Sequence, residues 1–329
     1  HPNVATSLNN LAGLYQVQGR YVEAEPLYQE SLEIWREQLG DRHLNVATSL
    51  NNLAALYQEQ NNYDQAEPLF QRSLAIREQI LGVNHPDVAS NLNNLALLYK
   101  DQNNYDPAEP LLQRSLAIVE RAFGENHPIV ATSLNNLALL FWAQNNLTST
   151  LNILQRSLSV EEANLNLNLI VGSESYKQNF LTTFAGTTDI AISLHLQSLP
   201  DNSTAAQLAL TTVLQRKGRL LDLFTNSQQI LREQLDPDSQ ALLSDLNAKG
   251  TQLSTLFYNR PESLPLDQYR TQVATLESEF QRLQAELSRR SSQFRALNQP
   301  IDLPTIQALL PTHTALVELV RYGVIDPAA

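Results

Sequence analysis

The sequence predicts an all-α fold in which pairs of helices stack into a solenoid and then continue into a helical bundle. The main observation is a segment that recurs every 42 residues, as HPNVATSLNNLAGLY from His1, HLNVATSLNNLAALY from His43, HPDVASNLNNLALLY from His85 and HPIVATSLNNLALLF from His127. A second segment has the same period, as YVEAEPLYQESLEIW from Tyr21, YDQAEPLFQRSLAIR from Tyr63 and YDPAEPLLQRSLAIV from Tyr105. Periods of about 20 to 50 residues are typical of stacked supersecondary units.

Each period contains two amphipathic helices. In the first period Leu8, Leu11, Ala12 and Tyr15 are spaced three and four apart and share one helical face. Between the two helices stands a residue that tolerates a left-handed helix end, at Gly19, Asn61, Asn103 and Asn145. The histidine that opens each period is expected just outside the first helix, where it can help to begin it.

After about residue 148 the period is lost, although helical spacing continues. One apolar series steps by three and four through Tyr269, Val273, Leu276, Phe280, Leu283 and Leu287. A second series can pair with it through Leu242, Leu246, Leu253 and Leu256. The two series predict a long helical hairpin with a loop at 259–265.

The last 29 residues change character again. A short helix is expected to end near Leu310, and residues 314–323 alternate as a β-strand does. Because a single strand is not stable alone, this stretch is expected to begin a further α/β domain. The predicted parts are therefore a repeat array at 1–160 with a degenerate fourth unit, a helical linker or capping bundle at 161–300, and the start of another domain at 301–329.

Composition excludes several classes of function. Acidic residues outnumber basic ones 34 to 22, for a net charge of −12, which disfavours nucleic acids and membranes as partners. The chain has no cysteine, so disulfides and thiolate chemistry are excluded for it. It has no apolar run of about 18 residues, and we expect a cytoplasmic protein. Since His1 lies inside a repeat, we also expect the chain to be part of a longer protein.

Residues 1–160 resemble the tetratricopeptide repeat (TPR), in the 42-residue form of kinesin light chains. The resemblance is carried by the Leu-Ala-x-x-Tyr core, for example Leu53, Ala54 and Tyr57, and by Ala66 and Ala108 of the second helices. It implies a right-handed superhelical solenoid whose concave groove binds a protein or peptide partner.

The second half resembles the segment that precedes a CHAT domain, a caspase- and separase-like cysteine peptidase. The matching stretches are residues 166–181, 188–202, 209–222 and 287–300, and residues 314–327 resemble the first strand of that domain. The resemblance implies that the downstream CHAT domain is itself a partner of this chain. No residue here matches the His–Cys dyad, so the fragment is expected not to be an enzyme and to need no cofactor.

Two asparagine columns on the first helices are the strongest candidate binding residues. They are Asn9, Asn51, Asn93 and Asn135, followed by Asn10, Asn52, Asn94 and Asn136. An amide both donates and accepts hydrogen bonds, so it can pair with the backbone of an extended peptide of any sequence. Kinesin-type TPRs, which this chain resembles, use such asparagines for peptide binding. The alternative is that the amides brace neighbouring repeats. Gln16, Gln58 and Lys100 lie two turns further along and could extend the same surface.

Other polar residues are interpreted as structural. The histidines of successive repeats are expected about 10 Å apart, too far to share a metal ion, so we expect no metal site and interpret them as residues at the entry to each first helix. Glu161 and Glu162 are interpreted as surface charge, and the basic run at 215–219 as a solvated face or a contact with another domain. The function expected is that of a sensing arm for a CHAT peptidase. Two alternatives remain, a non-catalytic assembly scaffold and an enzyme with its own site in residues 150–300.

Overall fold

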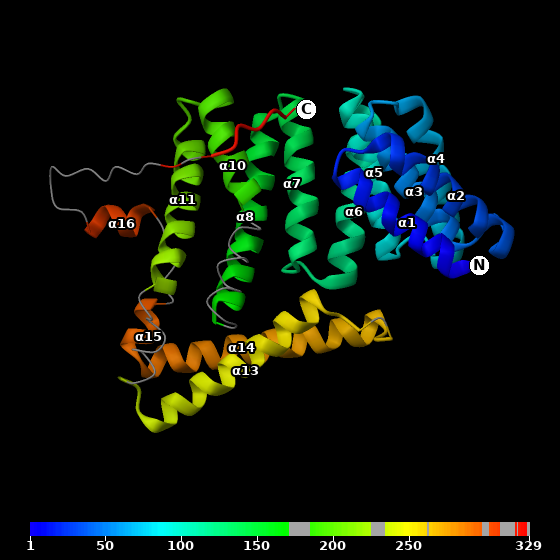
Figure 1. The fold of residues 1–329 in the computed structure, drawn as a ribbon. Coiled ribbons are helices and arrows are strands. Elements are labelled where there is room, and N and C mark those ends of the chain that lie inside the picture. The colour runs from blue at the N-terminus through cyan, green and yellow to red at the C-terminus, as the bar shows by residue number, and fades with distance from the viewer. Residues whose placement is uncertain are drawn as a thin grey trace. The chain divides into compact units, whose positions relative to one another are not determined.

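A computed structural model describes residues 1–170, 185–224, 234–261, 263–297, 303–309, 320 and 322–327. The chain divides into two compact units, one formed by residues 1–122 with 327–329 and the other by residues 123–326. Helices make up most of the described part of both units (Figure 1), as the sequence predicted. Each unit is described by itself.

The first unit consists of three helix pairs whose first helices begin 42 residues apart. The pairs are α1 (Pro2–Val17) with α2 (Tyr21–Leu39), α3 (Leu44–Glu59) with α4 (Tyr63–Leu81), and α5 (Pro86–Asp101) with α6 (Tyr105–Phe123). Helices α1 and α2 pack against each other, as α3 and α4 do, and α6 bonds to α5 through Ser115 and Ala89. Helix α2 contacts α3 as α4 contacts α5. The first helices also touch one another, α1 with α3 and α3 with α5. The first helices therefore lie side by side.

Sequence-specific signals begin and end these helices. The Nδ1 atom of His43 accepts a hydrogen bond from the backbone N–H of Asn45 at 3.1 Å, and His85 caps α5 in the same way through Asp87 at 3.2 Å. The turns within the pairs have left-handed backbone at Gly19 (φ 72°), Asn61 (φ 58°) and Asn103 (φ 57°). Both observations confirm the prediction that each histidine lies just outside a first helix and that a left-handed residue ends that helix.

Stacking of the repeats supplies much of the burial of the first helices. On α3 the apolar residues Val46, Leu53 and Leu56 are 0%, 4% and 0% exposed. The equivalent residues of α1, which has no preceding pair in this chain, are Val4, Leu11 and Leu14 at 48%, 40% and 53%. Identical side chains thus become core residues only when another pair covers them.

A buried serine ties the two helices of each pair together. Its hydroxyl donates to a backbone carbonyl 26 residues earlier on the first helix, in the pairs Ser31–Ala5 (2.8 Å), Ser73–Ala47 (2.7 Å) and Ser115–Ala89 (2.8 Å). The equivalent hydroxyl of Ser157 lies 3.2 Å from the carbonyl oxygen of Ala131. Because each serine is at most 2% exposed, these bonds fix the relative rotation of the helices in a pair.

The second unit begins with a fourth helix pair and continues with helices that do not repeat. Its elements are α7 (Pro128–Ala143), α8 (Leu147–Ile170), α10 (Ala185–Ser193), the π-helical turn η1 (Leu194–Ser198), α11 (Ser203–Phe224), α13 (Pro237–Tyr258), α14 (Leu266–Arg290), α15 (Ser292–Leu297) and α16 (Leu303–Leu309). Helices α10 and α11 pack against α8, and α13 also contacts α8. Residue 160, predicted to end the repeat array, lies within α8.

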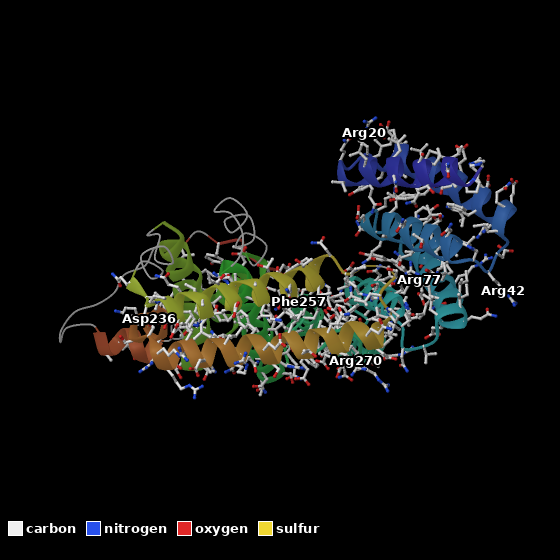
Figure 2. All side chains as sticks on the ribbon, turned by 90° about the horizontal axis from the view of Figure 1, so that it is seen from below. Arg20, Arg42, Arg77, Asp236, Phe257 and Arg270 are labelled. Atoms are coloured by element: carbon white, nitrogen blue, oxygen red, sulfur yellow. The ribbon has the colours of Figure 1, made fainter. Side chains whose placement is uncertain are left out.

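Helices α13 and α14 form the predicted hairpin. Tyr269, Leu246 and Leu287 are fully buried in its core, and the other residues of both predicted apolar series belong to the same cluster. Figure 2 shows Asp236 at the start of α13, where its carboxylate caps the helix by accepting from the backbone N–H of Ser239 at 3.0 Å. The hairpin is therefore confirmed in position and in register.

Part of the predicted C-terminal strand lies outside the described residues, namely 314–319 and 321. The described residues 320, 322 and 323 are not in a strand. None of the helices in the described part of the chain combines the length and the apolar character that a membrane crossing requires.

Candidate functional site

The two asparagine columns form a ladder across the first helices of the first unit. The Nδ2 atom of Asn52 donates to Oδ1 of Asn9 at 3.0 Å, and Nδ2 of Asn94 donates to Oδ1 of Asn51 at 3.1 Å. Each bond joins one repeat to the next, from the second column to the first. The amides therefore brace neighbouring repeats, which is one of the two roles considered for them.

A second ladder of the same kind lies two helical turns further along. Gln16 donates from Nε2 to Oε1 of Glu59 at 2.8 Å, and Gln58 donates to Oδ2 of Asp101 at 2.6 Å. In both cases a glutamine bonds to the residue that comes one position after its own equivalent in the next repeat. The two ladders give the first-helix side a regular polar surface with a period of one repeat.

The predicted binding residues differ in how far they reach solvent. Asn10 is exposed, whereas Asn9, Asn51, Asn52, Asn93, Asn94, Asn135, Asn136, Gln16 and Gln58 are half-buried. Lys100 is only 5% exposed, with its ammonium 3.6 Å from Oδ1 of Asp101 and 3.5 Å from the carbonyl oxygen of Pro327. It is thus much less accessible than Gln16 and Gln58, the equivalent residues of the first two repeats.

The ladder bond uses only one side of each amide. An amide oxygen has two lone pairs and an amide nitrogen two hydrogens. Within the described residues, the NH2 groups of Asn9 and Asn51 and the oxygen of Asn52 have no other bond. Because the ladder holds these amides in one orientation, the unused donors and acceptors have fixed directions.

In the second unit Asn135 belongs to a different, buried network. Its oxygen accepts from the hydroxyl of Ser157 at 2.6 Å, and its nitrogen donates to the hydroxyl of Thr187 at 2.7 Å. Thr187, on α10, in turn donates to Oε1 of Glu161 on α8. The same asparagine that bonds to a neighbouring repeat in the first unit here bonds to α8 and α10.

Glu161 is the centre of this network. Its Oε2 lies 2.7 Å from Nη2 of Arg216 on α11, in an ion pair whose side chains are 4% and 12% exposed. Burial raises the pKa of Glu161, and the hydrogen bond from Thr187 and the charge of Arg216 act in the opposite direction. The ion pair connects the fourth repeat to the helices that follow it, because Glu161 lies on α8 and Arg216 lies on α11.

The interpretation of Glu161 as a surface charge is therefore wrong. The residue is 3% exposed, since α10 and α11 cover that face of α8. The basic run at 215–219 supplies its partner through Arg216. No periodic pattern marks α10 or α11, so nothing in the sequence indicated which face of α8 they would cover.

The histidine column has no metal-binding arrangement. In the part of the chain that the structure describes, no three His, Asp or Glu side chains are grouped closely enough to hold a metal ion. Each histidine instead uses Nδ1 to cap a helix, and His127 does so through the backbone N–H of Ile129 at 3.2 Å. Its Nε2 lies 3.2 Å from the carbonyl oxygen of Phe257, so both ring nitrogens are occupied.

Sequence reasoning missed the serine column and the buried network. The serines had a detectable signal, because the same residue occurs at Ser31, Ser73, Ser115 and Ser157 among apolar neighbours. A polar residue repeated on an apolar face indicates a buried hydrogen bond. Thr187 and Arg216 had no comparable signal, since each occurs once in a non-periodic stretch.

Comparison with known proteins agrees with this architecture. A family model described as the tetratricopeptide repeat matches residues 3–79, 50–121 and 87–163. No curated protein sequence matches the chain.

Three crystal structures are similar at the level of the fold. BtubC (BKLC) from P. vanneervenii has a TM-score of 0.50 and 22% identity, over 66% of this chain and 81% of that one. A Podosopora anserina protein described as a putative kinesin light chain with nearly identical TPR-like repeats has a TM-score of 0.50 and 22% identity, over 67% and 96%. A variant of that second protein has a TM-score of 0.51 and 21% identity, over 66% and 96%. Residues 3–163 are therefore an array of tetratricopeptide repeats, a scaffold for protein interaction.

Proposed function

We propose that this chain is a protein-interaction module that binds an extended peptide along the first helices of its repeats. The amides of Asn9, Asn51 and Asn52 would pair with the peptide backbone, and Gln16 and Gln58 would extend the contact. The observation that carries the proposal is the asparagine ladder, which fixes the amides while leaving donors and acceptors unused. A backbone with alternating N–H and C=O groups matches such a surface whatever its side chains.

We further propose that the module is the sensing arm of a CHAT cysteine peptidase whose catalytic part is not in this chain. Support comes from the resemblance of residues 166–181 and 287–300 to the segment before that domain. The alternative is a non-catalytic assembly scaffold that uses the same face. Reading the coding sequence beyond Ala329 distinguishes them, because the peptidase requires a His at a strand end and a later Cys.

The experiment that tests peptide binding separates the two roles of one amide. In Asn51→Asp the carboxylate still accepts from Nδ2 of Asn94, so the ladder bond is retained. The substitution removes the NH2 group that would donate to a peptide carbonyl. We expect the free energy of unfolding to change by less than about 1 kcal/mol, and Kd to rise about tenfold, the value of one hydrogen bond.

The probe is a peptide selected on the wild-type chain from a random display library, and Kd is measured by calorimetry. Asn45→Asp is the matched control, because it makes the same chemical change on the same helix, about 120° away around the axis. An unchanged Kd in Asn51→Asp, or an equal loss in Asn45→Asp, would show that the amides only brace the repeats.

A further inference from the structure

The described C-terminal segment, residues 322–326, lies against the helices that follow the repeats in the second unit. It is extended and passes α10 and η1, as the red trace near α10 in Figure 1 shows. Its contacts come from α10, η1 and the helices around them, all within the second unit. This surface is separate from the asparagine ladder.

Two side chains of α10 and η1 bind the backbone of the segment. The hydroxyl of Ser193 accepts from the backbone N–H of Ile325 at 3.1 Å and donates to the carbonyl of Gly323 at 3.4 Å. Nε2 of Gln197 donates to the carbonyl oxygen of Ile325 at 3.2 Å. Ser193 is fully buried, so its hydroxyl is held in place for these two bonds.

Two apolar side chains of the segment are anchored on either side of α10. Tyr322 packs against a cluster formed by Ile192, Ala209 and Val213. Ile325 packs against a second cluster that includes Trp142, Leu154, Leu158, Ile190 and Leu194. Val324, between the anchors, is 72% exposed and makes no comparable contact. The surface therefore contacts the side chains of the first and fourth residues of the segment and leaves that of the third exposed to solvent.

The second residue, Gly323, lies close to a side chain of α10. A Cβ atom added to Gly323 would lie 2.8 Å from Oδ2 of Asp189 on α10 and 3.5 Å from its Cγ. Any larger residue at this position would have to displace that carboxylate. Together the contacts specify Tyr at the first position and Ile at the fourth, and they favour Gly at the second, where a Cβ atom would displace the end of the Asp189 side chain.

We propose that α10 and η1 form a docking site for an extended Tyr-Gly-x-Ile segment, and that residues 322–325 occupy it as a tethered ligand. Three of the bonds are made to backbone atoms, so a separate peptide with the same pattern fits the same site. The tether gives the resident segment an effective concentration of about 1 mM, so an added peptide binds only when the resident segment is released.

The test is a competition in the full chain. In Ile325→Asp a carboxylate replaces the anchor in the apolar cluster, which releases the resident segment. Val324→Asp introduces the same charge one residue earlier at an exposed position, and it is the matched control. The probe is a fluorescein-labelled peptide LVRYGVIDP, the sequence of residues 319–327, and binding is followed by fluorescence anisotropy.

We expect saturable binding to Ile325→Asp, and at least tenfold weaker binding to the wild type and to Val324→Asp. Adding Ser193→Ala to Ile325→Asp should weaken binding about tenfold, because two backbone bonds are lost. The same peptide with Asp in place of its Ile should not bind.

Circular dichroism establishes that each variant is folded, and Tyr322→Ser is the second releasing variant if Ile325→Asp does not fold. Absence of saturable binding to a folded, released chain would overturn the proposal. Binding that Ser193→Ala leaves unchanged would also overturn it, because the peptide would then lie elsewhere. Neither result bears on the asparagine ladder, so this proposal and the proposed function fail independently.

Discussion

Lowering the pH should destabilise the second unit, because His127 is buried where α7 meets the hairpin α13–α14. Its ring stacks on Phe123 with centroids 4.8 Å apart and meets Phe257 edge-on at 5.1 Å. Its Nδ1 accepts from Ile129 and its Nε2 donates to Phe257, an arrangement that requires the neutral imidazole. Protonation turns Nδ1 into a donor that faces the N–H groups at the start of α7. Phe257, labelled in Figure 2, lies on α13.

The size of the effect follows from the pKa. Burial lowers the pKa of His127 from 6.5 to about 4, while the carbonyl of Phe257 acts slightly in the opposite direction. Between these values the unfolded state binds more protons than the folded state, so stability falls as the pH falls from 6.5 to about 4. The whole shift corresponds to roughly 3 kcal/mol, of which about 2 kcal/mol should be lost between pH 7 and pH 5.

The perturbation is His127→Asn, which retains a capping side chain but removes the titrating group. The free energy of unfolding is measured in urea at about pH 7 and pH 5, in a Trp35→Phe background, so that Trp142 reports on the second unit. His85→Asn makes the same exchange at a cap whose imidazole is one third exposed. If His127→Asn and His85→Asn lose equal free energy of unfolding between about pH 7 and pH 5, the titration of buried His127 is not the cause of the loss of stability at low pH.

Three further predictions concern stability and are checked by urea unfolding. Ser73→Ala should cost about 1 to 3 kcal/mol, because the buried amide of Asn91, 2.7 Å from the hydroxyl, loses its acceptor; an unchanged midpoint would contradict this. Glu161→Ala should cost about 3 kcal/mol by removing the nearer of the two carboxylates beside Arg216, since Glu162 lies 3.6 Å away, and Glu161→Leu with Arg216→Leu should recover most of that loss; equal losses would show that the ion pair is not the cause. Asn61→Val should cost about 1 to 2 kcal/mol at its left-handed backbone position, whereas Asn61→Gly should be nearly neutral.

The repeats were predictable because each of their features occurs several times. The turn at Asn61, the cap at His43 and the apolar face of α3 each have counterparts in other periods, so chance agreement is excluded. The hairpin was predictable for a related reason, since six apolar residues of α14 maintain one spacing over five turns. In both cases local patterns agree with the final packing.

The environment of Glu161 and the site that holds Ile325 could not be predicted in the same way. Both depend on how α10 and α11 cover α8, and that contact is made by residues that occur once. Burial by a distant, non-periodic segment leaves no local pattern at the residue it covers. The bracing bonds of the asparagines were only partly predictable, because sequence alone does not give the 3.0 Å bond from Asn52 to Asn9.

The function that we propose requires the amides on the first helices to contact a bound peptide. The most direct measurement follows the side-chain NH2 resonances of asparagine in a ¹⁵N–¹H correlation spectrum as the display-selected peptide is added. We expect the resonances of Asn9, Asn51 and Asn52 to shift with one common saturation curve, while those of the turn residues Asn61 and Asn62 stay in place. A saturating peptide that leaves the three ladder amides unshifted would contradict it.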